Sequence, residues 1–147
     1  MILHAGLVAM RLDRAWIGAL ITGSAGAGKS DLMLRALDYG FRLVADDRTE
    51  VWSASGRLYG RAPEALRGLM EVRGLDVLAE PCLPLARIGL LLRCQEASER
   101  VERIPEPAFE QTCGVRLPLL RAHVLDASAP AKLRRALLHL GHDQPPA

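Results

Sequence analysis

The sequence predicts one α/β domain with a central mixed β-sheet, flanking helices and β-hairpins, and three consecutive segments carry this prediction. The first, residues 15–22, is an apolar run of the kind that forms a fully buried strand. The second, residues 23–30, is rich in glycine. The third, residues 31–39, consists of good helix formers and precedes Gly40, a residue type that commonly ends helices. A strand, a tight loop and a helix in this order are typical of α/β folds.

The glycine-rich segment also has a chemical interpretation. Residues 23–30 match the phosphate-binding pattern G-x-x-x-x-G-K-[ST]. In such a loop the backbone N–H groups hold phosphates, the lysine reaches the outer phosphates and the hydroxyl binds Mg²⁺. Lys29 and Ser30 occupy these two positions, so we expect the chain to bind a nucleoside triphosphate such as ATP together with Mg²⁺. The residues expected around the phosphates are Gly23, Ser24, Ala25, Gly26, Ala27, Gly28, Lys29 and Ser30.

The other elements follow from hydrophobic patterning and turn residues. Apolar or alternating runs predict strands, in order at residues 2–12, 15–22, 41–45, 50–60 (a hairpin around 55–56), 86–94 and 115–120. Residues 13–14 form a turn that joins the first two strands into a hairpin, and the first strand carries His4. Helical patterns predict helices at residues 31–39, 63–70 and 129–140. Residues 96–110 are charged and contain two prolines, which predicts a loop.

Composition narrows the class of protein. The chain has 147 residues, 50% of them hydrophobic, which suits a single domain over 1–147 with a frayed tail at 142–147. Lys and Arg number 19 against 17 Asp and Glu, a balance that argues against nucleic acid or a membrane surface as partner. Three cysteines without C-x-x-C spacing argue against a disulfide framework or a zinc site and favour the cytoplasm. No apolar run approaches the length of a membrane span.

Two acids, Asp46 and Asp47, directly follow the strand expected at residues 41–45. In α/β sheets ligands gather at the carboxyl ends of strands, so a strand parallel to 15–22 brings both carboxylates beside the phosphate loop. One carboxylate can then hold Mg²⁺ and the other can orient or deprotonate an attacking hydroxyl. The residues alone leave open which aspartate takes which role.

Four segments in order resemble the signature of the C-terminal catalytic domain of bacterial HPr kinase/phosphorylase. They are His4, the loop 23–30, Arg-Leu-Val-Ala-Asp-Asp at 42–47 and Met-Glu-Val-Arg-Gly-Leu at 70–75. The resemblance implies a fold related to phosphoenolpyruvate carboxykinase. It also implies an ATP- and Mg²⁺-dependent serine kinase that phosphorylates the phosphocarrier protein HPr, or its nitrogen-related paralogue, in regulation of the phosphotransferase system. The chain is similar to the short alphaproteobacterial form, in which the family's N-terminal domain is absent.

The resemblance also assigns roles to individual residues. It implies Asp47 as the general base, with Asp46 shaping the metal and water shell. Lys29 is expected to neutralise the β- and γ-phosphates, and His4 to lie near the transferring group. Mg²⁺ is expected to contact Ser30, Asp46 and Glu71.

The chain departs from the family after Leu78. There the family has a glycine-rich stretch with a catalytic arginine, whereas residues 79–86 read Ala-Glu-Pro-Cys-Leu-Pro-Leu-Ala. The later family motif tied to dephosphorylation, rich in Pro, Gly and Arg, remains only as Arg-Leu-Pro-Leu-Leu-Arg at residues 116–121. The resemblance therefore supports kinase activity better than phosphorylase activity, and a homo-oligomer is expected. Two alternatives stay open: a phosphate-loop kinase or NTPase acting on small molecules, and a nucleotide-dependent sensor without turnover.

Overall fold

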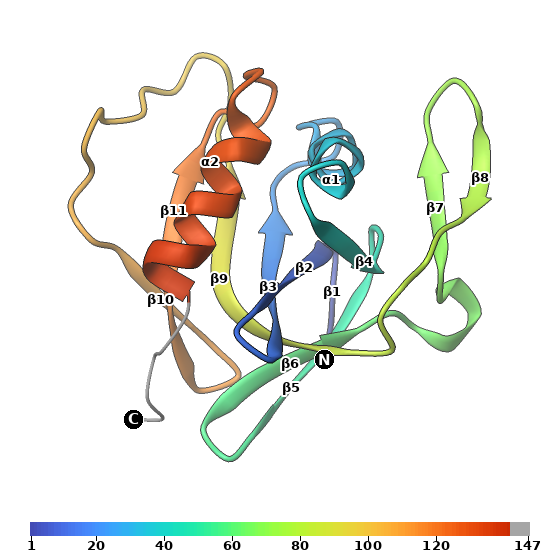
Figure 1. Cartoon of the computed structure of the whole chain (residues 1–147). Helices are drawn as coiled ribbons and strands as arrows, with labels where there is room; N and C mark the ends of the chain where they lie inside the picture. The colour runs from blue at the N-terminus through green and yellow to red at the C-terminus, as the bar shows by residue number, and fades with distance from the viewer. Residues whose placement is uncertain (142–147) are drawn as a thin grey trace.

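The computed structural model describes residues 1–141 and consists of a curled mixed β-sheet that carries both of its α-helices, α1 and α2, on one face (Figure 1). The strands are β1 Ile2–Leu3, β2 Gly6–Leu12, β3 Ala15–Thr22, β4 Phe41–Ala45, β5 Thr49–Ala54, β6 Arg57–Arg61, β7 Leu69–Val72, β8 Asp76–Ala79, β9 Ala86–Cys94, β10 Phe109–Thr112 and β11 Val115–Ala122. The helices are α1 Lys29–Leu37 and α2 Ala129–Ala136; α2 continues into a π-helical turn, Leu137–Gly141, and Glu64–Leu66 forms a 3₁₀ turn.

The strand order brings several carboxyl ends to one edge of the sheet. The main path runs β1-β5-β6-β9-β3-β2-β4, and β11 pairs with the C-terminal part of β9. β9 is parallel to β3 and to β11, whereas β2 is antiparallel to both β3 and β4. β4 therefore runs in the same direction as β3, as expected for the delivery of Asp46 and Asp47. The segments that follow β3, β4, β9 and β11 all begin at the same edge.

Both faces of the sheet centre are buried, which explains the unbroken apolar run of β3. Ile17, Ala19 and Ile21 pack under the two helices, in a core that includes Leu32 and Leu133. Leu20 points to the opposite face, where a second core is formed with β5, β6 and β11; its members include Leu7, Val51, Leu58, Leu91 and Leu119. The expected central mixed sheet with flanking helices and hairpins is confirmed, and a strand buried on both faces has no need to alternate.

The strand predicted at residues 2–12 is interrupted, so the expectation that His4 lies in a strand is wrong. β1 pairs with β5, whereas β2 pairs with β3 and β4, and the chain bends at His4 between these two sets of partners. The buried Thr49 hydroxyl stabilises the bend by donating a hydrogen bond to the carbonyl of Ala5 at 2.8 Å.

The helix predicted at residues 63–70 is also wrong apart from its first turn. The 3₁₀ turn Glu64–Leu66 ends before Gly68, whose φ of 74° is incompatible with a right-handed helix. The chain then forms the two-stranded hairpin β7–β8, with its turn at residues 73–75. The side chain of Met70, on β7, is fully buried. In Figure 1 this hairpin stands apart from the main sheet.

Other boundaries differ from expectation by a few residues. The loop predicted at residues 96–110 ends earlier, because Phe109 begins β10, which pairs with β11. α1 begins at Lys29, two residues before the predicted start, directly from the phosphate loop. The predicted tail, 142–147, lies outside the described residues. Within residues 1–141, no helix is long and apolar enough to cross a membrane.

Candidate active site

The phosphate loop leads directly into α1. Gly26 and Gly28 have φ values of 80° and 100°, in the left-handed region that side chains disfavour. Gly28 is the N-cap of α1, and within the described chain no side chain caps this end of the helix. The helix N-terminus carries partial positive charge and N–H groups that suit an anion. The loop therefore has the local geometry of a phosphate cradle.

Lys29 is held across the loop by backbone carbonyls. Its Nζ donates hydrogen bonds to the carbonyl oxygens of Gly23 at 2.8 Å and Ser24 at 3.0 Å. The residue is only 8% exposed, so the ammonium group is fixed rather than solvated. Because these partners are neutral, the full positive charge remains available to phosphate oxygens.

Gly23 allows the loop to approach β9 closely. A Cβ at Gly23 would lie 2.8 Å from the Cβ of Cys94 at the end of β9. Burial raises the pKa of the Cys94 thiol from 9.0 to about 11, and the nearby charge of Lys29 partly opposes this rise. Cys94 is therefore a neutral packing residue beneath the loop at physiological pH.

The raised pKa predicts that Cys94 reacts slowly with alkylating reagents. At pH 8 its thiolate fraction is expected to be about a hundredfold lower in the folded protein than in the urea-unfolded chain, since two pH units separate 9.0 from about 11. Labelling with iodoacetamide followed by peptide mass mapping measures the rate of Cys94 alkylation in the folded and in the urea-unfolded chain. Equal rates in the folded and unfolded chain would contradict the burial of this thiol.

The two aspartates after β4 face different partners. Asp46 accepts hydrogen bonds at both carboxylate oxygens, from the Ser30 hydroxyl at 2.9 Å and from the backbone N–H of Glu71 at 3.1 Å. Asp46 thus connects the phosphate loop, the end of β4 and strand β7. Ser30 and Asp46 were both expected near Mg²⁺, and the fold brings them into direct contact.

Asp47 is turned toward His4. Its φ is 69°, and the N–H of Arg48 donates to the carbonyl of Asp46 at 2.8 Å, closing a tight turn around it. The Oδ1 of Asp47 lies 3.3 Å from Nε2 of His4, and Oδ2 lies 3.4 Å from Nη1 of Arg48. Left-handed backbone at a non-glycine residue is strained and is often found at functional sites. The turn separates the two adjacent carboxylates into different environments.

A cleft of about 630 Å³ lies over the N-terminus of α1 and collects most of the predicted residues. Its lining comprises His4, Ala25, Gly26, Gly28, Lys29, Ser30, Asp31, Leu34, Asp47, Glu71, Val72, Arg73 and Leu125. Asp46 is not part of this lining and lies behind Ser30 and Glu71. Of the other loop residues, Ala27 packs against the core under the helices, whereas Gly23 and Ser24 line a second cavity.

The expected metal ligands are only partly gathered. Ser30 and Asp46 are in contact, but Glu71 reaches Asp46 through its backbone N–H. Among residues 1–141, no three His, Cys, Asp or Glu side chains form a group that could hold a metal ion. Mg²⁺ commonly binds through one or two protein oxygens, several waters and substrate phosphates. The donor set therefore fits Mg²⁺ that arrives with a triphosphate, rather than a preformed protein cage.

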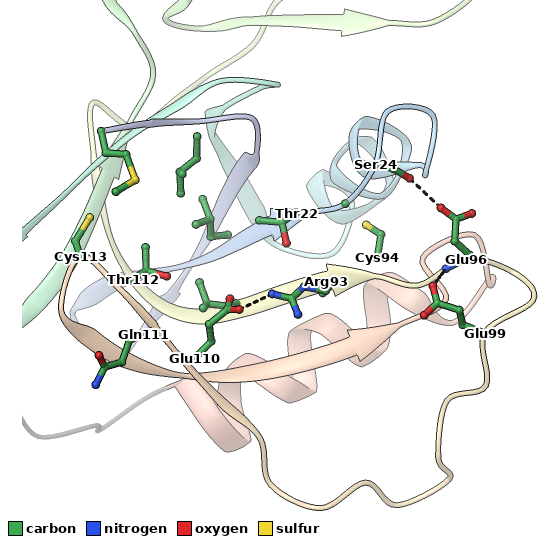
Figure 2. A pocket seen from close by; sticks show the side chains of 15 residues that line it. Thr22, Ser24, Arg93, Cys94, Glu96, Glu99, Glu110, Gln111, Thr112 and Cys113 are labelled. Atoms are coloured by element: carbon green, nitrogen blue, oxygen red, sulfur yellow. Dashed lines mark hydrogen bonds and ion pairs between the residues drawn. The ribbon is translucent and has the colours of Figure 1, made fainter.

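The second cavity, about 610 Å³, lies on the sheet face opposite the helices (Figure 2). Leu20 and Leu91 contribute to its apolar floor. Its rim is charged: Arg93 pairs with Glu110 at 2.6 Å, and the Ser24 hydroxyl donates to Glu96 at 2.9 Å. Figure 2 shows the Ser24–Glu96 contact at the end nearest the phosphate loop. No motif in the sequence indicated this cavity.

Sequence reasoning also missed the apolar residues that line the cleft. Leu34, Val72 and Leu125 line it, although none belongs to a phosphate-binding pattern. The only sequence signal for Leu34 is its position on α1, one turn after Asp31. Leu125 follows β11 in an irregular segment and has no sequence signal of its own.

Known proteins resemble both the sequence and the fold. The family model described as HPr Serine kinase C-terminal domain matches residues 3–80. HPr kinase/phosphorylase of Clostridium tetani is 43% identical over 81 residues, covering 55% of this chain and 25% of the relative. The Leptothrix cholodnii protein of the same name is 36% identical over 116 residues, covering 71% and 36%. The chain thus spans about a quarter to a third of the length of these relatives.

A solved structure supports the same conclusion for the fold. The Hpr(Ser) kinase/phosphatase from Coxiella burnetii superposes with a TM-score of 0.77 and covers 94% of this chain and 97% of its own, at 24% identity. The family model includes His4, the phosphate loop, both aspartates and Glu71, which line or adjoin the cleft described above. Because that match extends over more than half of the sequence, the chain belongs to the family of the HPr serine kinase C-terminal domain.

Proposed function

We propose that this chain is an ATP- and Mg²⁺-dependent protein kinase that phosphorylates a seryl hydroxyl of HPr or of its nitrogen-related paralogue. The observation that carries the proposal is the divergence of the aspartate pair: Asp46 is bonded to Ser30, and Asp47 faces the cleft beside His4. A phosphoryl transferase needs one acidic group near the metal and another near the attacking hydroxyl. A protein that only binds a nucleotide has no need of the second.

The phosphate end of ATP is assigned to the N-terminus of α1. Lys29 neutralises the β- and γ-phosphates, and the backbone N–H groups of the loop hold the phosphate oxygens. Ser30 and Asp46 are the residues that hold Mg²⁺, with Glu71 as an additional contact at the cleft wall. The metal, when bound, supplies positive charge against the charge that develops on the phosphate oxygens.

In the proposed transfer step, Asp47 accepts the proton of the attacking seryl hydroxyl. The seryl oxygen of the carrier protein bonds to the γ-phosphorus while the bond from phosphorus to the β,γ-bridging oxygen breaks. The seryl proton passes to the Asp47 carboxylate, and ADP leaves with the bond electrons. His4, 3.3 Å from Asp47, orients this carboxylate and brings an imidazole close to the transferring group. Arg73, at the hairpin turn, lines the cleft and is proposed as a further contact for phosphate.

The surroundings of the cleft favour a protein over a small molecule as acceptor. The β7–β8 hairpin lines the cleft through Glu71, Val72 and Arg73, yet its Leu75 and Val77 are 70% and 56% exposed. Exposed apolar side chains beside a site are typical of surfaces that contact another protein.

We propose the kinase direction of the reaction only, with a regulatory role in the phosphotransferase system. We also propose that the protein acts in the cytoplasm and self-associates into a homo-oligomer.

The decisive experiment incubates the chain with ATP, Mg²⁺ and purified HPr or its nitrogen-related paralogue, and maps the modified serine by mass spectrometry. A single phosphoserine on one carrier is the expected result. No phosphate on either carrier across a range of Mg²⁺ concentrations would contradict the proposal. Phosphate on metabolites instead would favour a small-molecule kinase, and tight ATP binding without transfer would favour a sensor.

A further inference from the structure

The phosphate loop lies between two other segments at the same edge of the sheet. Strand β3, which leads into the loop, is separated from β4 by β2 on one side and from β11 by β9 on the other. Asp46 and Asp47 follow β4, whereas residues 123–128 follow β11 and lead into α2. Figure 1 shows α1 between β4 and β7 on one side and α2 on the other. The cleft across the start of α1 therefore has an acidic end and an end formed by the segment after β11.

Leu125 marks the second end of the cleft. It is 69% exposed, yet its Cδ2 would lie only 2.7 Å from a Cβ placed on Gly28, the N-cap of α1. It provides apolar surface next to the phosphate loop. An exposed leucine in direct contact with a phosphate cradle has no role in the core of the domain.

Arg35 fixes the backbone on both sides of Leu125. Its Nη1 donates a hydrogen bond to the carbonyl of Asp126 at 3.0 Å, and its Nη2 donates to the carbonyl of Val124. Its Nε is paired with Asp31 at 2.9 Å on the preceding turn of α1. The guanidinium group thus attaches the Leu125 segment to the same helix that begins at the phosphate loop, and holds the leucine in place before any ligand binds.

We infer that Leu125, positioned by Arg35, is the apolar contact for the nucleoside end of the bound triphosphate. The inference rests on the proposed nucleotide binding. The γ-phosphate must lie near Asp47 to be transferred, so the chain of phosphates runs from the acidic end across the N-terminus of α1. The nucleoside then emerges at the opposite end, over Leu125, where a base can bury its flat apolar face.

The same geometry predicts weak discrimination between adenine and guanine. The carbonyls of Val124 and Asp126 already accept hydrogen bonds from Arg35, and the N–H of Asp126 donates to the carbonyl of His123 at 3.2 Å. Strong rejection of a wrong base requires buried polar groups that only the right base satisfies. A leucine side chain contacts either purine equally well, so ATP and GTP are expected to bind with similar affinity.

The cavity of Figure 2 is the competing position for the nucleoside, because Gly23 and Ser24 also border it. Its rim carries Glu96, Glu99 and Glu110, and its arginine, Arg93, is paired with Glu110. A polyanion approaching this rim meets like charge. The cavity also lies on the sheet face away from α1, whose N-terminus is the expected phosphate site.

The test compares the affinities of ATP, GTP and tripolyphosphate, each with Mg²⁺, by calorimetry for the wild type and three variants. Leu125→Ala is expected to lower the affinities for ATP and GTP about tenfold, the loss that corresponds to removing part of one leucine side chain from an apolar contact. The affinity for tripolyphosphate, which has no nucleoside, is expected to stay unchanged. Leu138→Ala, at a leucine 43% exposed beyond α2, is the matched control, and Gln111→Ala probes the cavity of Figure 2. Wild-type ATP and GTP affinities are expected to agree within about threefold.

A double-mutant cycle tests the positioning role of Arg35. Arg35→Ala should weaken the binding of ATP but not of tripolyphosphate. The double variant, which also carries Leu125→Ala, should bind ATP with about the affinity of whichever single variant binds ATP less tightly. Equal losses for ATP and tripolyphosphate, no effect of Leu125→Ala, or a selective loss of ATP in Gln111→Ala would each overturn the inference. Failure of the wild type to bind even tripolyphosphate would overturn the proposed phosphate site itself, a result distinct from these three.

Discussion

Replacing Lys29 with alanine is expected to lower the rate of phosphoryl transfer about a thousandfold, the loss typical of removing a preorganised charge from a transition state. Lys29 is 8% exposed, and the carbonyls of Gly23 and Ser24 hold its ammonium group at 2.8 and 3.0 Å. The charge is therefore in place before ATP arrives. Transfer of radiolabelled phosphate from ATP to the carrier protein measures the effect.

The chain offers a matched control for this substitution. Lys132 is exposed on α2, and Lys132→Ala removes the same charge at a residue that does not line the cleft. This variant is expected to retain the wild-type rate. If Lys29→Ala kept more than about a tenth of the wild-type rate, the lysine would contribute no more than an ordinary surface charge, and the proposed phosphate site would be wrong.

The parts of the fold that follow from local patterns were predictable. The strand, loop and helix around Lys29 are specified by consecutive residues: the buried run of β3, glycines with left-handed backbone and the helix formers of α1. β9 was predictable for the same reason, since its centre, residues 88–92, is buried on both faces of the sheet and is therefore a continuous apolar run. Such elements depend little on which segment lies beside them.

Other parts depend on pairing between distant residues, and the sequence does not display it. His4 lies in a bend because β1 and β2 pair with different strands, and β10 exists because β11 lies beside it. The same reason limits prediction of the site. Ser30 and Asp46 were both expected near Mg²⁺ from motifs, but their direct hydrogen bond was not predicted. Leu125 lines the cleft from the segment after β11, which Arg35 of α1 holds by long-range hydrogen bonds that no motif indicates.

Replacing each aspartate with asparagine is expected to have two different effects. Asp47→Asn should lower the turnover rate by about a hundredfold or more with unchanged ATP affinity, because the amide cannot accept the seryl proton. Asp46→Asn should instead raise the Mg²⁺ concentration needed for half-maximal rate by about tenfold to a hundredfold, because the neutral amide holds the metal less well and no longer orients Ser30 as the carboxylate does. Rates measured across a Mg²⁺ titration, together with ATP affinities, separate the two outcomes.

Asp13 provides the control for backbone strain, which could by itself explain a loss at Asp47. Asp13 has a φ of 47°, close to the 69° of Asp47, and it lies exposed in the β2–β3 turn at the opposite end of β3 from the phosphate loop. Asn tolerates left-handed backbone as Asp does, so Asp13→Asn is expected to change neither rate nor Mg²⁺ requirement. If Asp46→Asn lost turnover while Asp47→Asn only shifted the Mg²⁺ requirement, the two roles would be reversed, and the seryl hydroxyl would have to approach from behind Ser30.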